Sequence, residues 1–162
     1  MGKICFFTGH RELPPDKIDE IGNLLERALR KLIESGYTEF RAGGALGFDT
    51  LAAQVVLFLR SKYPHIRLVL ILPCKDQAKR WSERDQRIYE AIKEEADEVI
   101  YTSERYFRGC MQKRNRCLAD GSNGGICYLT KRTGGTAYTV DYAAKQGKPI
   151  CNVADRVTPA GA

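Results

Sequence analysis

Apolar residues along this chain follow two patterns, one typical of strands and the other of helices. Short apolar runs predict six strands, at residues 3–8, 38–41, 67–72, 98–101, 125–130 and 149–153. Apolar positions at helical spacing, together with start and stop signals, predict helices between them, at residues 18–33, 51–62, 83–95, 110–119 and 134–147. Strand and helix therefore alternate along the whole chain.

This alternation predicts an α/β fold, a Rossmann-like, doubly wound, mainly parallel sheet with helices on both faces. Residues 67–72 are almost continuously apolar, as expected of a strand that is covered on both sides. The chain has 162 residues, which is enough for one such core. We expect a single domain over residues 1–154, followed by a frayed tail at residues 155–162.

A first glycine turn, residues 43–47, follows the second predicted strand and precedes an apolar helix. It contains Gly43, Gly44 and Gly47, and Asp49 comes just after it. Glycine leaves no Cβ to obstruct a ligand, and the free N–H groups of the following helix favour a bound phosphate. Alternatively, the glycines only permit the turn and Asp49 caps the helix. The pattern matches neither the GxGxxG motif of dehydrogenases nor the Walker motif.

Four unusual loops follow the carboxyl ends of predicted strands, and these ends share one edge of a parallel sheet. They are Thr8-Gly9-His10-Arg11, the first glycine turn, residues 74–81 and residues 131–136. The last loop holds a second glycine turn, residues 134–136, formed by Gly134, Gly135 and Thr136. Thr136 contacts a ligand or caps the helix. We predict a binding crevice where two helix N-termini face one anion.

Several single side chains are candidates for this crevice, each with a structural alternative. Arg114 shares a predicted helix face with apolar residues, so it either pairs with a core carboxylate or clamps a phosphate, with Asn115 beside it. Trp81 either stacks on a base or packs in the core. His10 has no nucleophile pattern beside it that would support catalysis.

The positive charge of the chain is concentrated in one segment. Residues 105–132 carry seven basic side chains and one acid, Asp120, an excess equal to the net charge of +6 for the whole chain. This indicates an anionic partner, either a nucleotide or a nucleic-acid backbone, unless the segment is a solvated basic face.

The cysteines and the apolar runs indicate a cytoplasmic protein. The six cysteines are dispersed without metal-binding spacing, so we expect reduced thiols and no metal site. No apolar run is long enough to cross a bilayer, and the apolar start is too short for a signal peptide. We therefore expect no membrane partner.

Three segments together resemble the SLOG superfamily, which includes the DNA-processing protein DprA and the LOG phosphoribohydrolases: residues 40–53, Arg114-Asn115-Arg116 and residues 133–150. Residues 7–11 and the region of Cys74, Gln77 and Trp81 resemble its YpsA-like branch of small single-domain proteins. The resemblance implies a Rossmann-like fold that binds a nucleotide or an ADP-ribose-like ligand. The expected ligand-binding residues are Thr8, Gly9, His10, Arg11, Gly43, Gly44, Gly47, Asp49, Gln77, Trp81, Arg114, Asn115, Gly134, Gly135 and Thr136.

The resemblance leaves the question of turnover open. LOG enzymes carry a glutamate three residues after the threonine of their PGGxGT motif, and the matching position here is Thr139. Binding without catalysis, in a signalling role, is the first hypothesis. The alternatives are hydrolysis of a nucleoside monophosphate, with Arg114, Asp141 or Asp49 as catalytic candidates, and DprA-like binding of single-stranded DNA. We also expect a homo-oligomer, a dimer.

Overall fold

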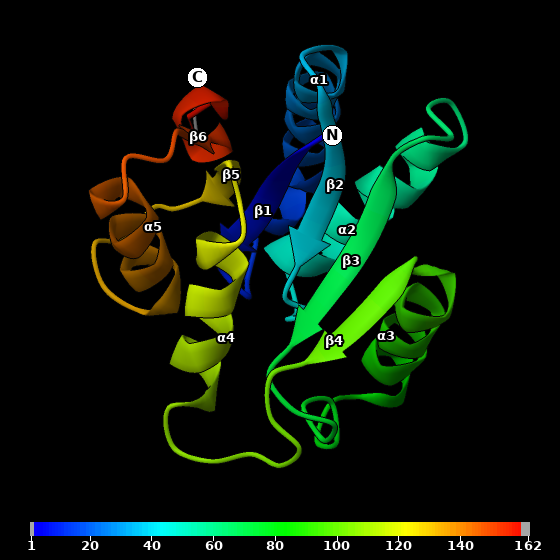
Figure 1. Ribbon diagram of the computed structural model, residues 1–162, viewed down its shortest axis with the longest axis vertical. Helices are drawn as coiled ribbons and strands as arrows, with labels where there is room; N and C mark the ends of the chain where they lie inside the picture. The colour runs from blue at the N-terminus through cyan, green and yellow to red at the C-terminus, as the bar shows by residue number, and fades with distance from the viewer. Residues whose placement is uncertain (1, 160–162) are drawn as a thin grey trace.

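A six-stranded parallel sheet with helices on both faces forms the fold of residues 2–159, the part of the chain that the computed structural model describes (Figure 1). The strands are β1 (Lys3–Gly9), β2 (Tyr37–Ala42), β3 (Arg67–Leu72), β4 (Glu98–Tyr101), β5 (Gly124–Tyr128) and β6 (Ile150–Asn152). The helices are α1 (Ile18–Glu34), α2 (Phe48–Arg60), α3 (Glu83–Glu95), α4 (Cys110–Asp120) and α5 (Gly135–Lys145), with short 3-10 helices η1 (Pro15–Lys17) and η2 (Val153–Arg156). The predicted fold class is confirmed.

The strand order is β4-β3-β2-β1-β5-β6, so the direction of winding reverses between β1 and β5. From β1 the chain moves outward to β4, and then it returns to the other side of β1 to form β5 and β6. All neighbouring strands are parallel. The carboxyl ends of β1 and β5 therefore diverge into loops on opposite faces, which opens a crevice between them.

Alternate residues of the central strands enter two separate apolar cores. Phe7 packs with the side chains of α1 and α2, whereas the adjacent Phe6 packs with Leu118 and Ala143 of α4 and α5. In β3, Leu70 belongs to the same core as Phe7, and the adjacent Val69 belongs to the same core as Phe6. Because strand side chains alternate between the faces, a nearly unbroken apolar run is needed when helices cover both of them.

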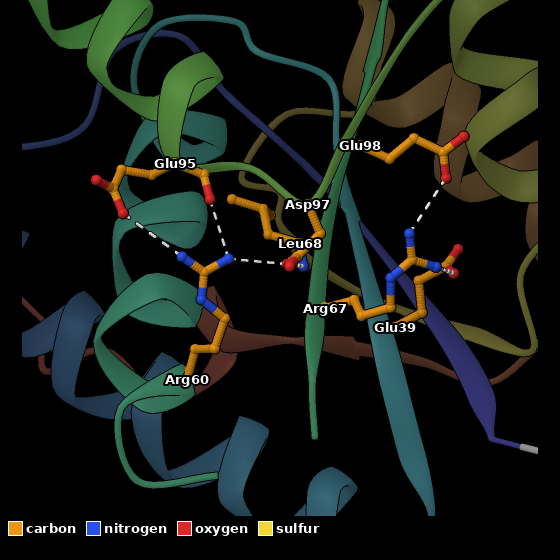
Figure 2. A network of polar contacts seen from close by, with 7 residues as sticks. All are labelled: Glu39, Arg60, Arg67, Leu68, Glu95, Asp97 and Glu98. Atoms are coloured by element: carbon orange, nitrogen blue, oxygen red, sulfur yellow. Dashed lines mark hydrogen bonds and ion pairs between the residues drawn. The ribbon is translucent and has the colours of Figure 1, made fainter. Parts of the chain in front are cut away.

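Hydrogen bonds and ion pairs between polar side chains connect the amino ends of the strands, at the edge of the sheet away from the crevice (Figure 2). The carboxylate of Asp97 accepts the backbone N–H of Leu68 and a guanidinium N–H of Arg60, both at 2.8 Å. Arg67 bridges Glu39 and Glu98, with both N–O distances at 3.3 Å. The polar groups at this edge satisfy one another, whereas the opposite edge holds the predicted site.

The chain after β6 packs against the body of the domain, in contrast to the frayed tail predicted from residue 155. Val153 is buried in the core at the start of η2, and Val157 packs against that core. The backbone N–H of Thr158 donates to the carboxylate of Glu20 at 2.6 Å. These apolar contacts were not evident from so short a segment. Residues 160–162 of the predicted tail lie outside the described residues.

No helix within residues 2–159 combines the length and the apolar character that a membrane span requires.

Candidate functional site

A cavity of about 420 Å³ lies at the reversal point between β1 and β5, which we call the switch cavity. Its walls are the end of β1 and the loop after it, Ala45 of the first glycine turn with the start of α2, helix α4 and the loop after β5. Many of the predicted ligand-binding residues line it: Thr8, Gly9, His10, Arg11, Asp49, Arg114, Asn115, Gly134, Gly135 and Thr136. The fold thus brings residues from four separate segments of the chain around one space.

The second glycine turn is open toward the switch cavity. Gly134 is the N-cap of α5, with a φ of 98°, and no side chain caps this helix. A Cβ at Gly134 would meet nothing within 4 Å, and one at Gly135 would meet only the side-chain nitrogen of Asn115, at 3.7 Å. The first N–H groups of a helix have no partner within it, and its positive dipole end attracts anions. Thr136 lies inside the helix and is not its cap.

The first glycine turn is filled by the protein itself. A Cβ at Gly43 would lie 2.7 Å from the guanidinium of Arg114, and one at Gly47 would overlap the carbonyl of Arg11. A Cβ at Gly44 would overlap Leu72. None of the three glycines lines the switch cavity. Their missing side chains let neighbouring segments approach closely, and they leave no free space for a ligand.

Asp49 acts as an internal acceptor for the first glycine turn. Its carboxylate accepts the backbone N–H of Ala45 at 3.3 Å, and the residue is 5% exposed. Burial raises the pKa of Asp49 to about 6, against the opposing effect of the charge on Arg114. The N-cap of α2 is Gly47, so the alternative that Asp49 caps the helix is wrong. A carboxylate of the chain itself thus lies beside the turn where a bound anion was predicted.

Arg114 is buried between α4 and the first glycine turn. Its guanidinium donates to the carbonyl of Gly43, and its Nε donates to the side-chain oxygen of Asn115 at 2.9 Å. Burial lowers the pKa of Arg114, while the charge of Asp49 opposes this shift. Among the described residues no carboxylate lies within 4 Å of the guanidinium, so the alternative in which Arg114 forms a salt bridge to a core carboxylate is wrong. Arg114 also lines the switch cavity.

His10 connects three segments through hydrogen bonds. Its Nε2 accepts the backbone N–H of Thr130 at 2.9 Å, and its carbonyl accepts the N–H of Phe48 at 3.1 Å. Burial lowers the pKa of His10, and the charge of Lys131 adds to this effect. A neutral imidazole that accepts through Nε2 fixes the loop after β1 against the loop after β5.

Two residues of the predicted site, Gln77 and Trp81, lie away from the switch cavity. The ring of Trp81 packs edge-to-face on Tyr89, with centroids 5.2 Å apart, in agreement with the packing alternative. The side-chain nitrogen of Gln77 donates to the hydroxyl of Tyr89 at 3.4 Å. Both residues follow β3, and β2 separates β3 from β1. Sharing the carboxyl edge of the sheet does not bring them to the crevice.

The catalytic candidates are also divided between different places. Asp141 lies beside a separate hollow next to Lys131 and Arg132. Thr139, at the position of the LOG glutamate, is fully buried, and its hydroxyl donates to the carbonyl of Gly135 at 2.8 Å. Asp49 is the acid among the residues that line the switch cavity.

The cavity wall also contains Lys131, Thr133 and Gln112, which are absent from the predicted ligand-binding residues. Lys131 and Thr133 belong to the loop at residues 131–136, which the sequence placed at the crevice without singling out these two side chains. Gln112 lies on α4 near Arg114, and helical spacing was its only signal. Among residues 2–159 no three His, Cys, Asp or Glu side chains gather as metal ligands.

Solved structures with the same fold include two forms of DNA processing protein A. The protein from Helicobacter pylori, whose single-stranded DNA binding mode has been described, has a TM-score of 0.64 at 20% identity. The protein from Streptococcus pneumoniae has a TM-score of 0.64 at 16% identity. Each match covers more than 90% of this chain, which spans 63% and 49% of the two proteins, respectively. At such identities the likeness establishes the fold.

Sequence relatives are closer. The chain is 33% identical to the UPF0398 protein BH1768 of Halalkalibacterium halodurans, over 80% of this chain and 70% of that protein. It is 31% identical to the SPbeta prophage-derived protein YoqJ of Bacillus subtilis, over 78% of this chain and 80% of that protein. The YpsA family model, described as the YspA SLOG family, matches residues 5–153. The predicted resemblance is confirmed, and the chain belongs to the YspA SLOG family.

Proposed function

We propose that the switch cavity binds a small phosphorylated nucleotide or nucleotide-derived ligand, with its phosphate on the second glycine turn. The observation that carries this proposal is the uncapped N-terminus of α5, where nothing lies within 4 Å of a Cβ built at Gly134. Small-molecule sites have volumes of about 300 to 1,000 Å³, a range that includes the volume of about 420 Å³ at this turn.

The charges and the hydrogen-bonding groups around the switch cavity support an anionic, polar ligand. Arg11, Arg114 and Lys131 line it, against the single acid Asp49. This excess of positive charge, added to the dipole of α5, favours a phosphate. The side chains of Thr8 and Asn115 are nearly buried in the wall, where they offer partners for ribose hydroxyls.

The proposal is for binding without turnover. At the position of the LOG glutamate, the hydroxyl of Thr139 is engaged with a backbone carbonyl and supplies no carboxylate. Asp141 does not line the switch cavity. The remaining acid, Asp49, is held by the first glycine turn. A ligand that stays intact in the cavity fits a sensing role.

Isothermal titration with AMP, ADP-ribose and NAD tests this function. We expect saturable binding of at least one of them, weakened at least tenfold in the double variant Arg11→Ala/Lys131→Ala. The matched control is Arg87→Ala, because Arg87 is exposed on α3 and does not line the cavity. Chromatography of the same mixtures should show intact nucleotide. Absence of binding by all three compounds, or equal affinity in the double variant, would contradict the proposal.

Single-stranded nucleic acid is a second candidate, favoured by one surface feature. The loop before α4 exposes Tyr106 and Phe107, which are 65% and 45% accessible, between Arg105 and Arg108. Aromatic rings beside cations form stacking platforms for unpaired bases. The fold shared with DNA processing protein A agrees with this candidate.

Fluorescence anisotropy with labelled oligothymidylate tests the second candidate. Affinity should fall steeply as the salt concentration rises, and it should fall at least tenfold in Tyr106→Ala/Phe107→Ala. Phe58→Ala is the matched control, since Phe58 is 52% exposed on α2. If the affinity for oligothymidylate changes neither with the salt concentration nor in Tyr106→Ala/Phe107→Ala, this interface is excluded.

A further inference from the structure

Another hollow lies away from the switch cavity, between α1 and the edge of the sheet formed by β5 and β6. We call it the α1 groove. Its volume is about 430 Å³. The apolar part of its lining includes Leu24, Ala28 and Leu32 of α1, together with Ile126 of β5 and Val153 of η2. None of these residues belongs to the predicted ligand site.

The α1 groove exists because the apolar face of α1 is wider than the part of it that is buried in the core. Ile21, Leu25, Leu29 and Ile33 form one stripe, and they are buried. Leu24, Ala28 and Leu32 form a second, partly exposed stripe displaced by one residue. On the sheet side, Gly124 contributes no side chain, and β6 has only three residues. The crossover helix α5 packs on the other face of the sheet, and on the α1 side Ile150 and Cys151 of β6 line the groove.

Three cations surround this apolar floor, and no acid is among the lining residues. Arg27 and Lys31 lie one turn apart on α1, and Arg156 lies opposite them on η2. All three are exposed, and within residues 2–159 none of them forms an ion pair. An uncompensated group of positive charges beside an apolar surface is complementary to a molecule with an apolar body and an anionic end.

We propose that the α1 groove is a binding site for a small amphipathic anion, such as a medium-chain carboxylate. The apolar chain lies between the Leu24–Ala28–Leu32 stripe and β5, and the anionic group lies among Arg27, Lys31 and Arg156. A symmetric contact with a second copy is disfavoured, because it would bring these cations close to their own equivalents. This site is independent of the function proposed for the switch cavity.

Titration with dodecanoate tests the site, with dodecyltrimethylammonium as a probe of equal chain length and opposite charge. We expect saturable one-to-one binding of dodecanoate and at least tenfold weaker binding of the cation. Backbone amide shifts in nuclear magnetic resonance spectra should move around Ala28 and Ile126 and stay unchanged at Gly135. Equal affinity for the two probes, no saturable binding, or shifts centred on Gly135 would overturn the proposal.

Two kinds of variant localise the binding. Ala28→Trp places a ring in the hollow and should abolish binding of dodecanoate. Arg27→Glu/Lys31→Glu changes only exposed side chains, so it keeps the test valid if Ala28→Trp folds poorly, and it should weaken binding at least tenfold. Arg84→Glu/Arg87→Glu on α3 is the matched charge control, since both arginines are exposed and neither lines the groove. If the α1 pair and the α3 pair weaken binding equally, the effect is one of net charge and the assignment is wrong.

Discussion

The two glycine turns have nearly the same sequence form, yet the fold uses them in opposite ways. Each follows a strand, contains a glycine with positive φ and precedes a helix without a side-chain cap. The missing Cβ atoms of the first turn admit Arg114, Leu72 and the backbone of Arg11. At the second turn a Cβ on Gly134 would meet nothing within 4 Å, and one on Gly135 would meet only the side-chain nitrogen of Asn115.

The comparison shows that a glycine-rich turn has two distinct physical uses. In the first turn the absent side chains allow the loop after β1, strand β3 and helix α4 to approach the backbone, and a buried carboxylate accepts a turn N–H. In the second turn the absent side chains leave the helix N–H groups accessible. What occupies the position of the absent Cβ, rather than the glycine pattern, distinguishes a turn that is filled by packing from one that is open to a ligand.

The largest effect should follow from filling the first turn. Gly47→Ala puts a Cβ into the carbonyl of Arg11 at a φ of 76°. This sparsely populated backbone conformation costs about 1–3 kcal/mol for a residue with a Cβ, and overpacking adds about 1–3 kcal/mol. We expect urea denaturation to show a loss of about 2–6 kcal/mol in the free energy of unfolding.

Gly134→Ala is the control within the second turn. Its φ of 98° carries a comparable backbone cost, but nothing obstructs the new methyl group. The loss should therefore be about 1–3 kcal/mol, without the added cost of overpacking. If both variants lose the same stability, the packing difference between the turns has no energetic consequence.

The contribution of Asp49 to the free energy of unfolding should depend on pH. The pKa of this carboxyl is about 6 in the folded protein, against 3.8 for an unperturbed aspartate, so the folded state binds the proton more tightly. Its contribution to stability is therefore complete below pH 4 and is lost as the pH rises through 6. From linkage, the loss is of the order of 3 kcal/mol.

Asp49→Asn removes that titration and keeps an oxygen that accepts the N–H of Ala45. The difference in unfolding free energy between Asp49→Asn and the parent should rise in favour of the variant between pH 4 and pH 7. Urea titrations at several pH values measure it. A difference that is constant over this range would mean that Asp49 keeps an ordinary pKa.

Gly135→Ala separates binding from stability in the second turn. The new methyl group meets only the side-chain nitrogen of Asn115, at 3.7 Å, and a helix position favours alanine over glycine. Unfolding free energy should stay within about 1 kcal/mol of the parent. Calorimetry should nevertheless show at least tenfold weaker binding of the nucleotide ligand, because the methyl group narrows the approach to the N–H groups of α5. Unchanged affinity would show that the phosphate of the ligand does not bind at this turn.

Much of the fold could be predicted from the sequence, because its signals are local and repeated. The apolar run of β3 and the stripes of α1 have the periods of a covered strand and an amphipathic helix. The rule that ligands bind at the carboxyl edge of the sheet also led to Thr8–Arg11 and to the second glycine turn. The fold class followed from the order of strands and helices alone.

The remaining features depend on strand order and on contacts between distant segments. The sequence does not state that β5 returns to lie beside β1, so it could not separate Lys131, which lines the switch cavity, from Trp81, which does not. It also could not show that Arg114, 71 residues away in sequence, donates to the carbonyl of Gly43. That hydrogen bond is one reason why the first turn is closed.

The smallest expected effect concerns Gln77, which lies on the packed side of the first turn. Its side-chain nitrogen would be 3.3 Å from a Cβ at Gly44, and its Oε1 is buried without a hydrogen-bond partner among the described residues. Gln77→Met keeps the shape, removes that unpaired oxygen and also loses the 3.4 Å hydrogen bond to Tyr89; these two effects oppose each other, so stability should change by less than about 1 kcal/mol. Nucleotide affinity by calorimetry should stay within about twofold, since Gln77 does not line the switch cavity in which we propose that the ligand binds. A tenfold loss of affinity would show that the ligand also reaches the loop after β3. In that case both glycine turns, and not the second alone, would contribute to binding.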